Sequence, residues 1–212
     1  ILLSFGQINK KMKKCVDTSL MDWINKPNNY IIGKSKVIME TKPFTNFWGK
    51  TYYHHTQSNG SALVLDIKQN FSFSVRVDYD YKNQFDQSGM LLYASSDNWV
   101  KIYTEDIDDE CISVSCSVCI HGYCDTSSMR MGKAIKYIYF RIDHLDEDFR
   151  VLYSLNKRKY KTMRIFHLKN RTGKFKVGIY AASPKDSSFD VVFSEMIISD
   201  CEWKAYNKEN YE

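Results

Sequence analysis

The sequence lacks several features that would point directly to a function. No apolar run is long enough to cross a bilayer as a helix, which excludes a helical membrane span. A glycine-rich phosphate loop and a serine nucleophile elbow are both missing, so neither nucleotide binding nor serine hydrolysis is indicated. No internal repeat or low-complexity linker divides the 212 residues, and we therefore expect one main domain.

The basic residues are not concentrated in any stripe. Thirty Lys and Arg against 25 Asp and Glu give a net charge of +5, spread along the chain, so a nucleic-acid partner is not expected. The apolar residues 1–5 precede a group of lysines, the reverse of the order in a signal peptide, and we expect a cytoplasmic protein. Tyrosine is abundant, at 15 residues, and suits both sheet faces and contacts to sugars or peptides.

Short strands, rather than helices, account for the hydrophobic pattern. In residues 71–79 Phe, Phe, Val, Val and Tyr alternate with Ser, Ser, Arg and Asp, which is typical of a half-buried antiparallel strand. Similar segments span 30–40, 46–53, 61–67, 71–81, 87–94, 98–105, 111–120, 134–143, 148–154, 161–167, 173–182 and 188–198. About a dozen short strands in one domain predict an all-β, two-sheet antiparallel jelly-roll sandwich.

The predicted domain occupies residues 22–204, between a basic amphipathic extension (1–21) and a C-terminal tail (205–212). The amphipathic extension could form one short helix. The period-two pattern also predicts core residues, which are Phe71, Phe73, Val75, Val77, Val100, Ile102, Ile138 and Phe140.

One strand, residues 99–105, has an unusual second face. A half-buried strand normally shows small polar side chains to water, whereas this face carries Trp99, Lys101, Tyr103 and Glu105. We interpret it as the floor of a binding surface. Lys101 and Glu105 are about 13 Å apart along the strand, so each needs a partner from a neighbouring strand. We expect Gln87 to join them in one connected polar group, with Trp48 and Trp99 close by.

Other predicted strands carry comparable side chains opposite an apolar face. If these strands are neighbours in one curved sheet, their aromatic and charged side chains line its concave side. The expected ligand-binding residues are Trp48, Tyr52, Gln87, Trp99, Lys101, Tyr103, Glu105, Arg141 and Arg164. The alternative is that the tyrosines and tryptophans form a second hydrophobic layer, because aromatic residues are often buried.

Several short motifs occur in an order that matches a known family. They are Asn46-Phe47-Trp48, then residues 85–92 with Asp-Gln-Ser-Gly, then residues 98–101 with Trp-Val-Lys, and finally residues 177–184. Over roughly residues 22–200 the chain resembles the domain family of unknown function titled after the regulation-of-enolase protein, within the concanavalin A-like lectin/glucanase superfamily. The resemblance implies a jelly roll whose concave face could hold a saccharide. Residues 124–128 depart from the family pattern, because they lack its tryptophan.

Catalytic and metal sites are less well supported by the sequence. Residues 105–110 hold five acids, and a retaining glycosidase needs two carboxylates about 5–5.5 Å apart, but such a dense run is more typical of a solvated turn. Cysteines at 111, 116, 119 and 124 have a spacing that superficially suits a metal. Strand alternation points Cys119 away from the face of Cys116, so we expect free thiols and no metal, with a Cys119–Cys124 hairpin disulfide left open.

Three functions are therefore compatible with the sequence. The first is non-catalytic carbohydrate binding on the concave sheet, where aromatic rings stack on sugars and charged groups bond the hydroxyls. The second is a protein-interaction or regulatory domain that uses the same face, because Tyr, Trp and Arg are also enriched in protein hot spots. The third is a glycosidase. We expect no cofactor.

Overall fold

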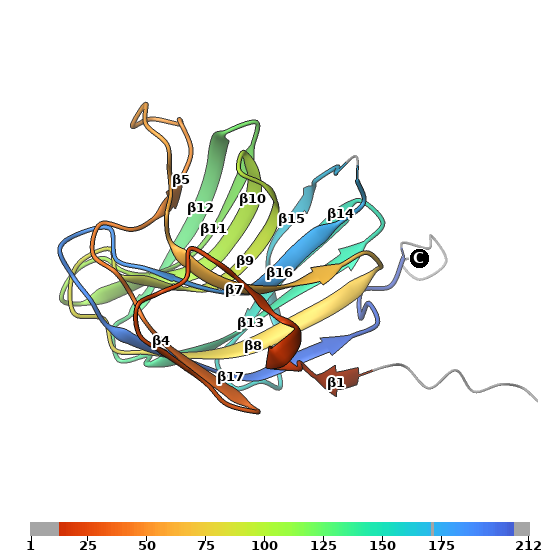
Figure 1. Ribbon diagram of the computed structural model, residues 1–212, viewed down its shortest axis with the longest axis horizontal. Coiled ribbons are helices and arrows are strands. Elements are labelled where there is room, and N and C mark those ends of the chain that lie inside the picture. The colour runs from red at the N-terminus through yellow and green to blue at the C-terminus, as the bar shows by residue number, and fades with distance from the viewer. Residues whose placement is uncertain (1–12, 171, 206–212) are drawn as a thin grey trace, which may run out of the picture.

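The computed structural model describes residues 13–170 and 172–205, and it consists almost entirely of β-strands. Two large antiparallel sheets pack face to face (Figure 1), which confirms the predicted two-sheet jelly-roll sandwich. The helical part of the described chain is a 3₁₀ turn, η1 (Thr18–Leu20). No helix in these two segments is long and apolar enough to cross a membrane.

The first sheet has the order β15-β14-β13-β8-β17-β4-β3, and a short N-terminal strand, β1, pairs with β17. The bounds are β15 (Lys161–His167), β14 (Asp148–Ser154), β13 (Tyr137–Leu145), β8 (Phe71–Tyr79), β17 (Asp190–Ser199), β4 (Lys36–Glu40), β3 (Tyr30–Ile32) and β1 (Lys13–Cys15).

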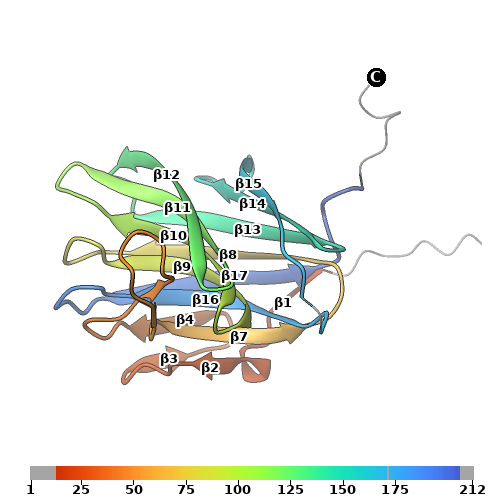
Figure 2. The same ribbon diagram turned by 90° about the horizontal axis from the view of Figure 1, so that it is seen from above.

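The second sheet has the order β12-β11-β10-β9-β16-β7-β2. Its strands are β12 (Tyr123–Gly132), β11 (Cys111–Ile120), β10 (Asn98–Asp106), β9 (Gln87–Ser95), β16 (Phe175–Ala182), β7 (Ser61–Ile67) and β2 (Asp22–Ile24). Seen from above, β12 and β15 lie at one end of the sandwich and β2 and β3 at the other (Figure 2). A two-stranded ribbon, β5 (Phe47–Trp48) and β6 (Gln57–Ser58), stands apart from both sheets.

The inner faces of the two sheets form the main core. All eight predicted core residues are buried, at 0–1% exposure, so the predicted face assignment is confirmed. Phe73 illustrates why: it lies in register with Ile142 on β13 and with Ile198 on β17. Residues one step along the same strand, Ser72 and Ser74, point to the outer side.

The predicted strands differ from the structure in three places. The segment 30–40, predicted as one strand, is a hairpin of two strands, β3 and β4. The predicted strand 46–53 ends at Trp48, because the chain turns there and adopts positive φ at Tyr52 (64°) and His54 (55°). Strand β12 was not predicted, because its sequence YCDTSSMRMG is polar and mostly exposed. It nevertheless pairs with β11 along its whole length.

The structure describes part of the predicted N-terminal extension (1–21) and part of the predicted C-terminal tail (205–212). Lys13–Cys15 adds a strand to the first sheet, and Val16 and Met21 are buried in the core. The described part of the predicted extension therefore packs on the sandwich. Residues 1–12 of the predicted amphipathic stretch and residues 206–212 of the predicted tail lie outside the described residues.

Candidate functional site

The candidate site lies on the outer face of the second sheet, over β10. Val100 and Ile102 point into the core, so period-two alternation turns Lys101, Tyr103 and Glu105 outward. Their partners across the ladder on β11 are three serines, Ser117, Ser115 and Ser113 respectively. The neighbouring strand on the other side, β9, places Gln87 opposite Glu105.

A network of hydrogen bonds joins three of these side chains through one amide. The Lys101 Nζ donates to Gln87 Oε1 at 2.7 Å, and Gln87 Nε2 donates to Glu105 Oε1 at 3.2 Å. The Tyr180 hydroxyl is a second donor to Gln87 Oε1, at 2.9 Å. The predicted connected group of Lys101, Gln87 and Glu105 is thus confirmed, with Gln87 holding the two charges apart while it bonds to both.

Lys101 is 1% exposed, and its ammonium is surrounded mainly by aromatic rings. The nitrogen lies 4.3 Å from the ring centroid of Tyr103, 5.9 Å from that of Trp48 and 6.0 Å from that of Tyr180. Asn46 Oδ1 accepts a further bond from it at 3.0 Å. A buried cation is tolerated here because ring quadrupoles and two amide oxygens replace water.

Burial moves the pKa values of both charged groups toward neutrality. Desolvation lowers the pKa of Lys101 to about 8, although the Glu105 carboxylate opposes the change. Desolvation likewise raises the pKa of Glu105 to about 7, against the opposing effect of Lys101. A change of pH or the approach of a charged ligand near neutrality can therefore alter the protonation of this group.

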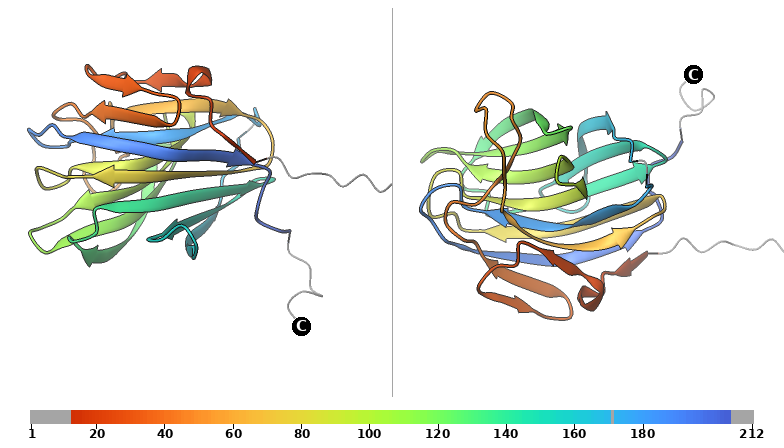
Figure 3. Two further views of the ribbon diagram at one scale, coloured as in Figure 1. Left: turned by 90° about the horizontal axis from the view of Figure 1, so that it is seen from below. Right: turned by 45° about the horizontal axis from the view of Figure 1, so that its top comes forward.

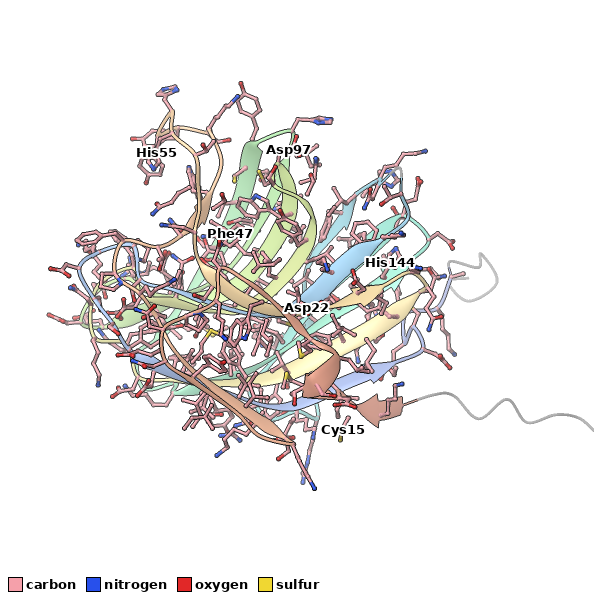
Figure 4. All side chains as sticks on the ribbon, viewed as in Figure 1. Cys15, Asp22, Phe47, His55, Asp97 and His144 are labelled. Carbon is pink, nitrogen blue, oxygen red and sulfur yellow. The ribbon has the colours of Figure 1, made fainter. Side chains whose placement is uncertain are left out.

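The segment that joins β4 to β7, and carries β5 and β6, crosses the outer side of the second sheet (Figure 3) and walls a groove of about 460 Å³. Figure 4 places Phe47 at the base of this segment and His55 at its tip. The groove is lined by Asn46, Trp48, Tyr53, His55, Gln57, Phe85, Lys101, Tyr103, Glu105, Ile107, Ser113, Ser115, Thr126, Ser128 and Pro184. Aromatic rings thus share it with hydroxyls from β11 and β12.

The exposed aromatic side chains of the groove come from its walls. Tyr53 is 60% exposed and Phe85 37%, and Trp48 is partly exposed, with its Nε1 bonded to the Thr51 carbonyl at 3.0 Å. Trp48 and Tyr53 contact each other edge to face, with ring centroids 5.5 Å apart. Tyr103, in contrast, is only 3% exposed and forms part of the floor beneath Lys101.

Four of the nine predicted ligand-binding residues, Trp48, Lys101, Tyr103 and Glu105, line the groove. Gln87 is buried behind them and acts through its hydrogen bonds. Trp99 is buried beneath Phe47, with ring centroids 5.5 Å apart, so for this residue the alternative of a second hydrophobic layer is correct. Tyr52 is 79% exposed on the turn after β5 and does not line the groove.

The two predicted arginines belong to the other sheet. Arg141, on β13, bonds Asp143 and Glu202, at 3.2 and 2.7 Å. Arg164, on β15, bridges to Asp125 on β12 at 2.9 Å, at the end of the sandwich where the two sheet edges meet. The prediction that both arginines share a face with Lys101 is wrong. For Arg141 alternation gave the face but not the sheet that its strand joins. Arg164 lies opposite the core-facing Val151, so its face was wrong as well as its sheet.

The acidic residues of the 105–110 segment do not all face the groove. Glu105 faces the groove, whereas Asp106 pairs with Lys133 at 2.8 Å and Asp108 pairs with Arg130. Within the described part of the chain, Glu105 is the groove's single carboxylate. All six cysteines are free thiols, and no three His, Cys, Asp or Glu side chains of residues 13–170 and 172–205 are arranged to hold a metal ion.

The sequence contained a signal for the hydroxyl side of the groove that was missed. Ser113, Ser115 and Ser117 alternate with Ile112, Val114 and Cys116, and therefore had to lie on the outer face. By contrast, Tyr53 and Phe85 reach the groove from turns, through positive φ values that strand alternation cannot reveal, at Phe85 (74°) and beside Tyr53. His55, on the same turn as Tyr53, also lines the groove.

Comparison with known proteins agrees with this fold. Residues 23–201 match the model of the family described as "Protein of unknown function (DUF1349)". The chain belongs to this family. The protein "Regulation of enolase protein 1" of Saccharomyces cerevisiae is 27% identical over 182 residues, which are 86% of this chain and 90% of that protein.

Solved structures share the architecture. A functionally unknown protein from Saccharomyces cerevisiae has a TM-score of 0.82 and 25% identity, over 89% of this chain and all of that one. The glycoside hydrolase family 43 protein BlXynB from Bacillus licheniformis has a TM-score of 0.66 at 12% identity, over 94% of this chain and 40% of its own. A legume lectin-like domain from Entamoeba histolytica has a TM-score of 0.56 at 13% identity, over 86% of this chain and 91% of that domain. The last two identities show a common fold alone.

Proposed function

We propose that the groove over β10 binds a carbohydrate without cleaving it. The observation that carries the proposal is the division of the groove into two kinds of surface. Exposed aromatic rings of Trp48 and Tyr53 form one wall, while serine and threonine hydroxyls of β11 and β12 lie beside the charged floor. A sugar ring has an apolar face and a rim of hydroxyls, so it is complementary to both surfaces at once.

The charged floor suits hydroxyl recognition. The carboxylate of Glu105 uses Oε1 to accept from Gln87, and the residue borders the groove, where its second oxygen can accept from a sugar hydroxyl. Hydrogen bonds to a charged group contribute about 1.5–3 kcal/mol, more than neutral ones. A volume of about 460 Å³ lies within the range of small-molecule sites.

The arrangement supports binding better than hydrolysis. Both the retaining and the inverting mechanism generally need two carboxylates across the scissile bond. The described lining of the groove supplies only Glu105, because Asp106 and Asp108 are paired with cations elsewhere. The likeness to a glycoside hydrolase family 43 protein, at 12% identity, is a likeness of fold alone.

The test is a glycan array followed by calorimetric titration of any saccharide that binds. Tyr53→Ser should weaken binding about tenfold, because an aromatic stacking contact is worth about 0.5–1.5 kcal/mol beyond its buried area. Tyr123→Ser is the matched control, since Tyr123 is as exposed as Tyr53, at 60%, but does not line the groove. Equal effects of the two substitutions, or no binding to any saccharide on the array, would contradict the proposal.

The second candidate is a protein-interaction domain that uses the same face. It is favoured by tyrosines that stand at the rim beyond the groove lining, Tyr52 at 79% exposure and Tyr123 at 60%. Exposed tyrosines are enriched in protein hot spots. For this function Tyr123→Ser would weaken a purified partner's binding, whereas it would not affect a saccharide held in the groove.

A further inference from the structure

Two cysteines face each other at the end of the β11–β12 hairpin, beside the groove. Cys119 and Cys124 are directly opposite in the strand register. The other cysteines of β11 have no such partner, since Cys111 lies opposite Gly132 and Cys116 opposite Ser127. Both thiols of the Cys119–Cys124 pair are free and buried, at 1% and 6% exposure.

The hairpin geometry suits a disulfide at this pair. His121 and Gly122 form its two-residue turn with φ values of 52° and 79°, as a type I′ turn requires, so Ile120 and Tyr123 form the hydrogen-bonded pair that flanks it. The next pair, Cys119 and Cys124, is then a non-hydrogen-bonded pair, with Cα atoms about 4.5 Å apart. That separation lies within the range of disulfides, about 4.4–6.8 Å.

The backbone of the pair agrees with this assignment. The Cys124 N–H does not point toward β11; it donates to Thr51 Oγ1 at 2.9 Å, in the segment that follows β5. The side chains of a non-hydrogen-bonded pair approach each other more closely than those of its neighbours. A new S–S bond here would therefore leave the ladder hydrogen bonds of both strands in place.

The two sulfurs are covered by the backbone of the loop at residues 49–51. The Gly49 N–H donates to Cys124 Sγ at 3.0 Å, and the Lys50 N–H donates to the Gly122 carbonyl at 2.8 Å. A Cβ at position 49 would lie 2.3 Å from the Gly122 oxygen and 3.1 Å from Cys119 Sγ, so only glycine fits. This loop leads directly into Tyr53, a wall of the groove.

We propose that Cys119 and Cys124 are a redox modification site, which a peroxide converts to a reversible disulfide that loosens the 49–51 loop from the hairpin. The Cys124 thiolate attacks one peroxide oxygen and becomes a sulfenic acid, releasing water once the departing hydroxide is protonated. The Cys119 thiol then displaces that hydroxyl as a second water. Overall two thiols and one peroxide give one disulfide and two waters.

The environment of the sulfurs supports this division of roles. The hydrogen bond from Cys119 lowers the pKa of Cys124, with the Gly49 N–H and the Lys101 charge acting in the same direction, although burial opposes them. The same hydrogen bond, together with burial, raises the pKa of Cys119. Cys124 is accordingly the thiol that attacks, and Cys119 the thiol that resolves. The proposal does not depend on carbohydrate binding.

The effect on the loop follows from the hydrogen bonds of the sulfur. Forming the S–S bond draws the Cys124 sulfur to about 2.05 Å from that of Cys119 and so displaces it from the Gly49 N–H, which weakens that hydrogen bond. Losing about one hydrogen bond's contribution should raise the open population of the loop roughly twofold to tenfold. Cleavage by trypsin after Lys50 follows that population while the loop closes faster than it is cut.

The first experiment identifies the bond in the full chain after mild treatment with hydrogen peroxide. Free thiols are alkylated under denaturing conditions and the protein is digested with chymotrypsin, which can cut after Tyr123 and so separate Cys119 from Cys124. A linked peptide pair that dithiothreitol separates is expected in the wild type and in Cys111→Ser, the matched control. The proposal is overturned if both thiols stay alkylatable at peroxide concentrations that oxidise the exposed Cys15.

The second experiment tests the coupling to the loop. Oxidised wild type should be cut after Lys50 about twofold to tenfold faster than the reduced protein, and dithiothreitol should reverse the change. Cys119→Ala, which cannot form the disulfide, should show no such change after the same treatment. Unchanged cleavage in a fully oxidised wild type, or an equal change in Cys119→Ala, would refute the coupling.

Discussion

The buried ammonium of Lys101 makes stability depend on pH in a direction opposite to that of most lysines. A lysine that gains a carboxylate partner normally has a raised pKa, but desolvation lowers the pKa of Lys101 from 10.5 to about 8. Between these values the unfolded chain binds more protons than the folded one. The free energy of unfolding should therefore rise with pH across this window.

The magnitude follows from the same pKa values. Lys101 is 1% exposed, so no correction for solvent screening is needed. Each unit of difference between the folded and unfolded pKa values is worth about 1.4 kcal/mol, so the free energy of unfolding should change by about 3 kcal/mol across the whole window. Between pH 7.5 and 9.5, below the range where tyrosines titrate, about 2 kcal/mol of this increase should be visible.

Glu105 contributes with the opposite sign in a lower range. Burial raises its pKa from 4.5 to about 7, so its favourable contribution is complete below pH 4.5 and is lost as the pH rises through about 7. Measurements above pH 7.5 therefore isolate Lys101 almost completely. The lowest stability of the pair is expected near pH 7 to 8, where both groups carry most of their charge in a buried setting.

The assay is urea unfolding at several pH values, for the wild type and for the double variant Lys101→Met/Glu105→Gln, in which neither position titrates. The difference between the two free energies should rise by about 2 kcal/mol from pH 7.5 to 9.5. Both proteins carry Cys124→Ala as a background, because the Lys101 charge acts on that thiol, and subtracting the variant then removes the contributions of the remaining titratable groups. A constant or falling difference would refute the view that desolvation exceeds the attraction of Glu105 at this site.

Two further predictions concern packing. Phe73→Ala should reduce the free energy of unfolding by about 3–5 kcal/mol, because it leaves a cavity between β13 and β17, whereas Ala at the 60% exposed Ile165 should change it by less than about 0.5 kcal/mol. Gly60→Ala should cost about 1–3 kcal/mol in the same denaturation assay, since its Cβ would lie 2.6 Å from the Tyr180 ring. Gly132→Ala is its control, with no atom within 4 Å of the new Cβ, and an equal loss there would contradict the packing argument.

The fold was predictable because its information is local. Alternation in segments such as 71–79 shows which side of each strand is buried, and a dozen such strands leave few architectures besides a sandwich. Strand β12 was missed because an edge strand with polar residues on both faces has no hydrophobic period to detect. Its place depends on hydrogen bonds to β11, which are set by the turn at His121 and Gly122.

The site was predictable only where its residues share one ladder. Gln87 and Glu105 are opposite each other on sequential strands, so their contact followed from a short connection and antiparallel pairing. Tyr53 and Phe85 approach the groove through turns with positive φ, and no pattern in the sequence fixes where such a turn points. The sequence therefore predicts the floor of the groove, which consists of strands, but not its walls, which consist of loops.

Arg141 shows why the same alternation both succeeded and failed. The rule correctly placed its guanidinium opposite the core-facing Ile138, Phe140 and Ile142. A sandwich, however, has two outer faces, and β13 pairs with β8 in the first sheet while β10 lies in the second. Which outer face a strand contributes to depends on pairing between distant segments, as in Ile138 with Val77, which are 61 residues apart in the sequence. An outer-face residue can therefore be assigned to a site only when the pairing partners of its strand are known. Lys101, Gln87 and Glu105 meet this condition because their strands, β9 and β10, are neighbours.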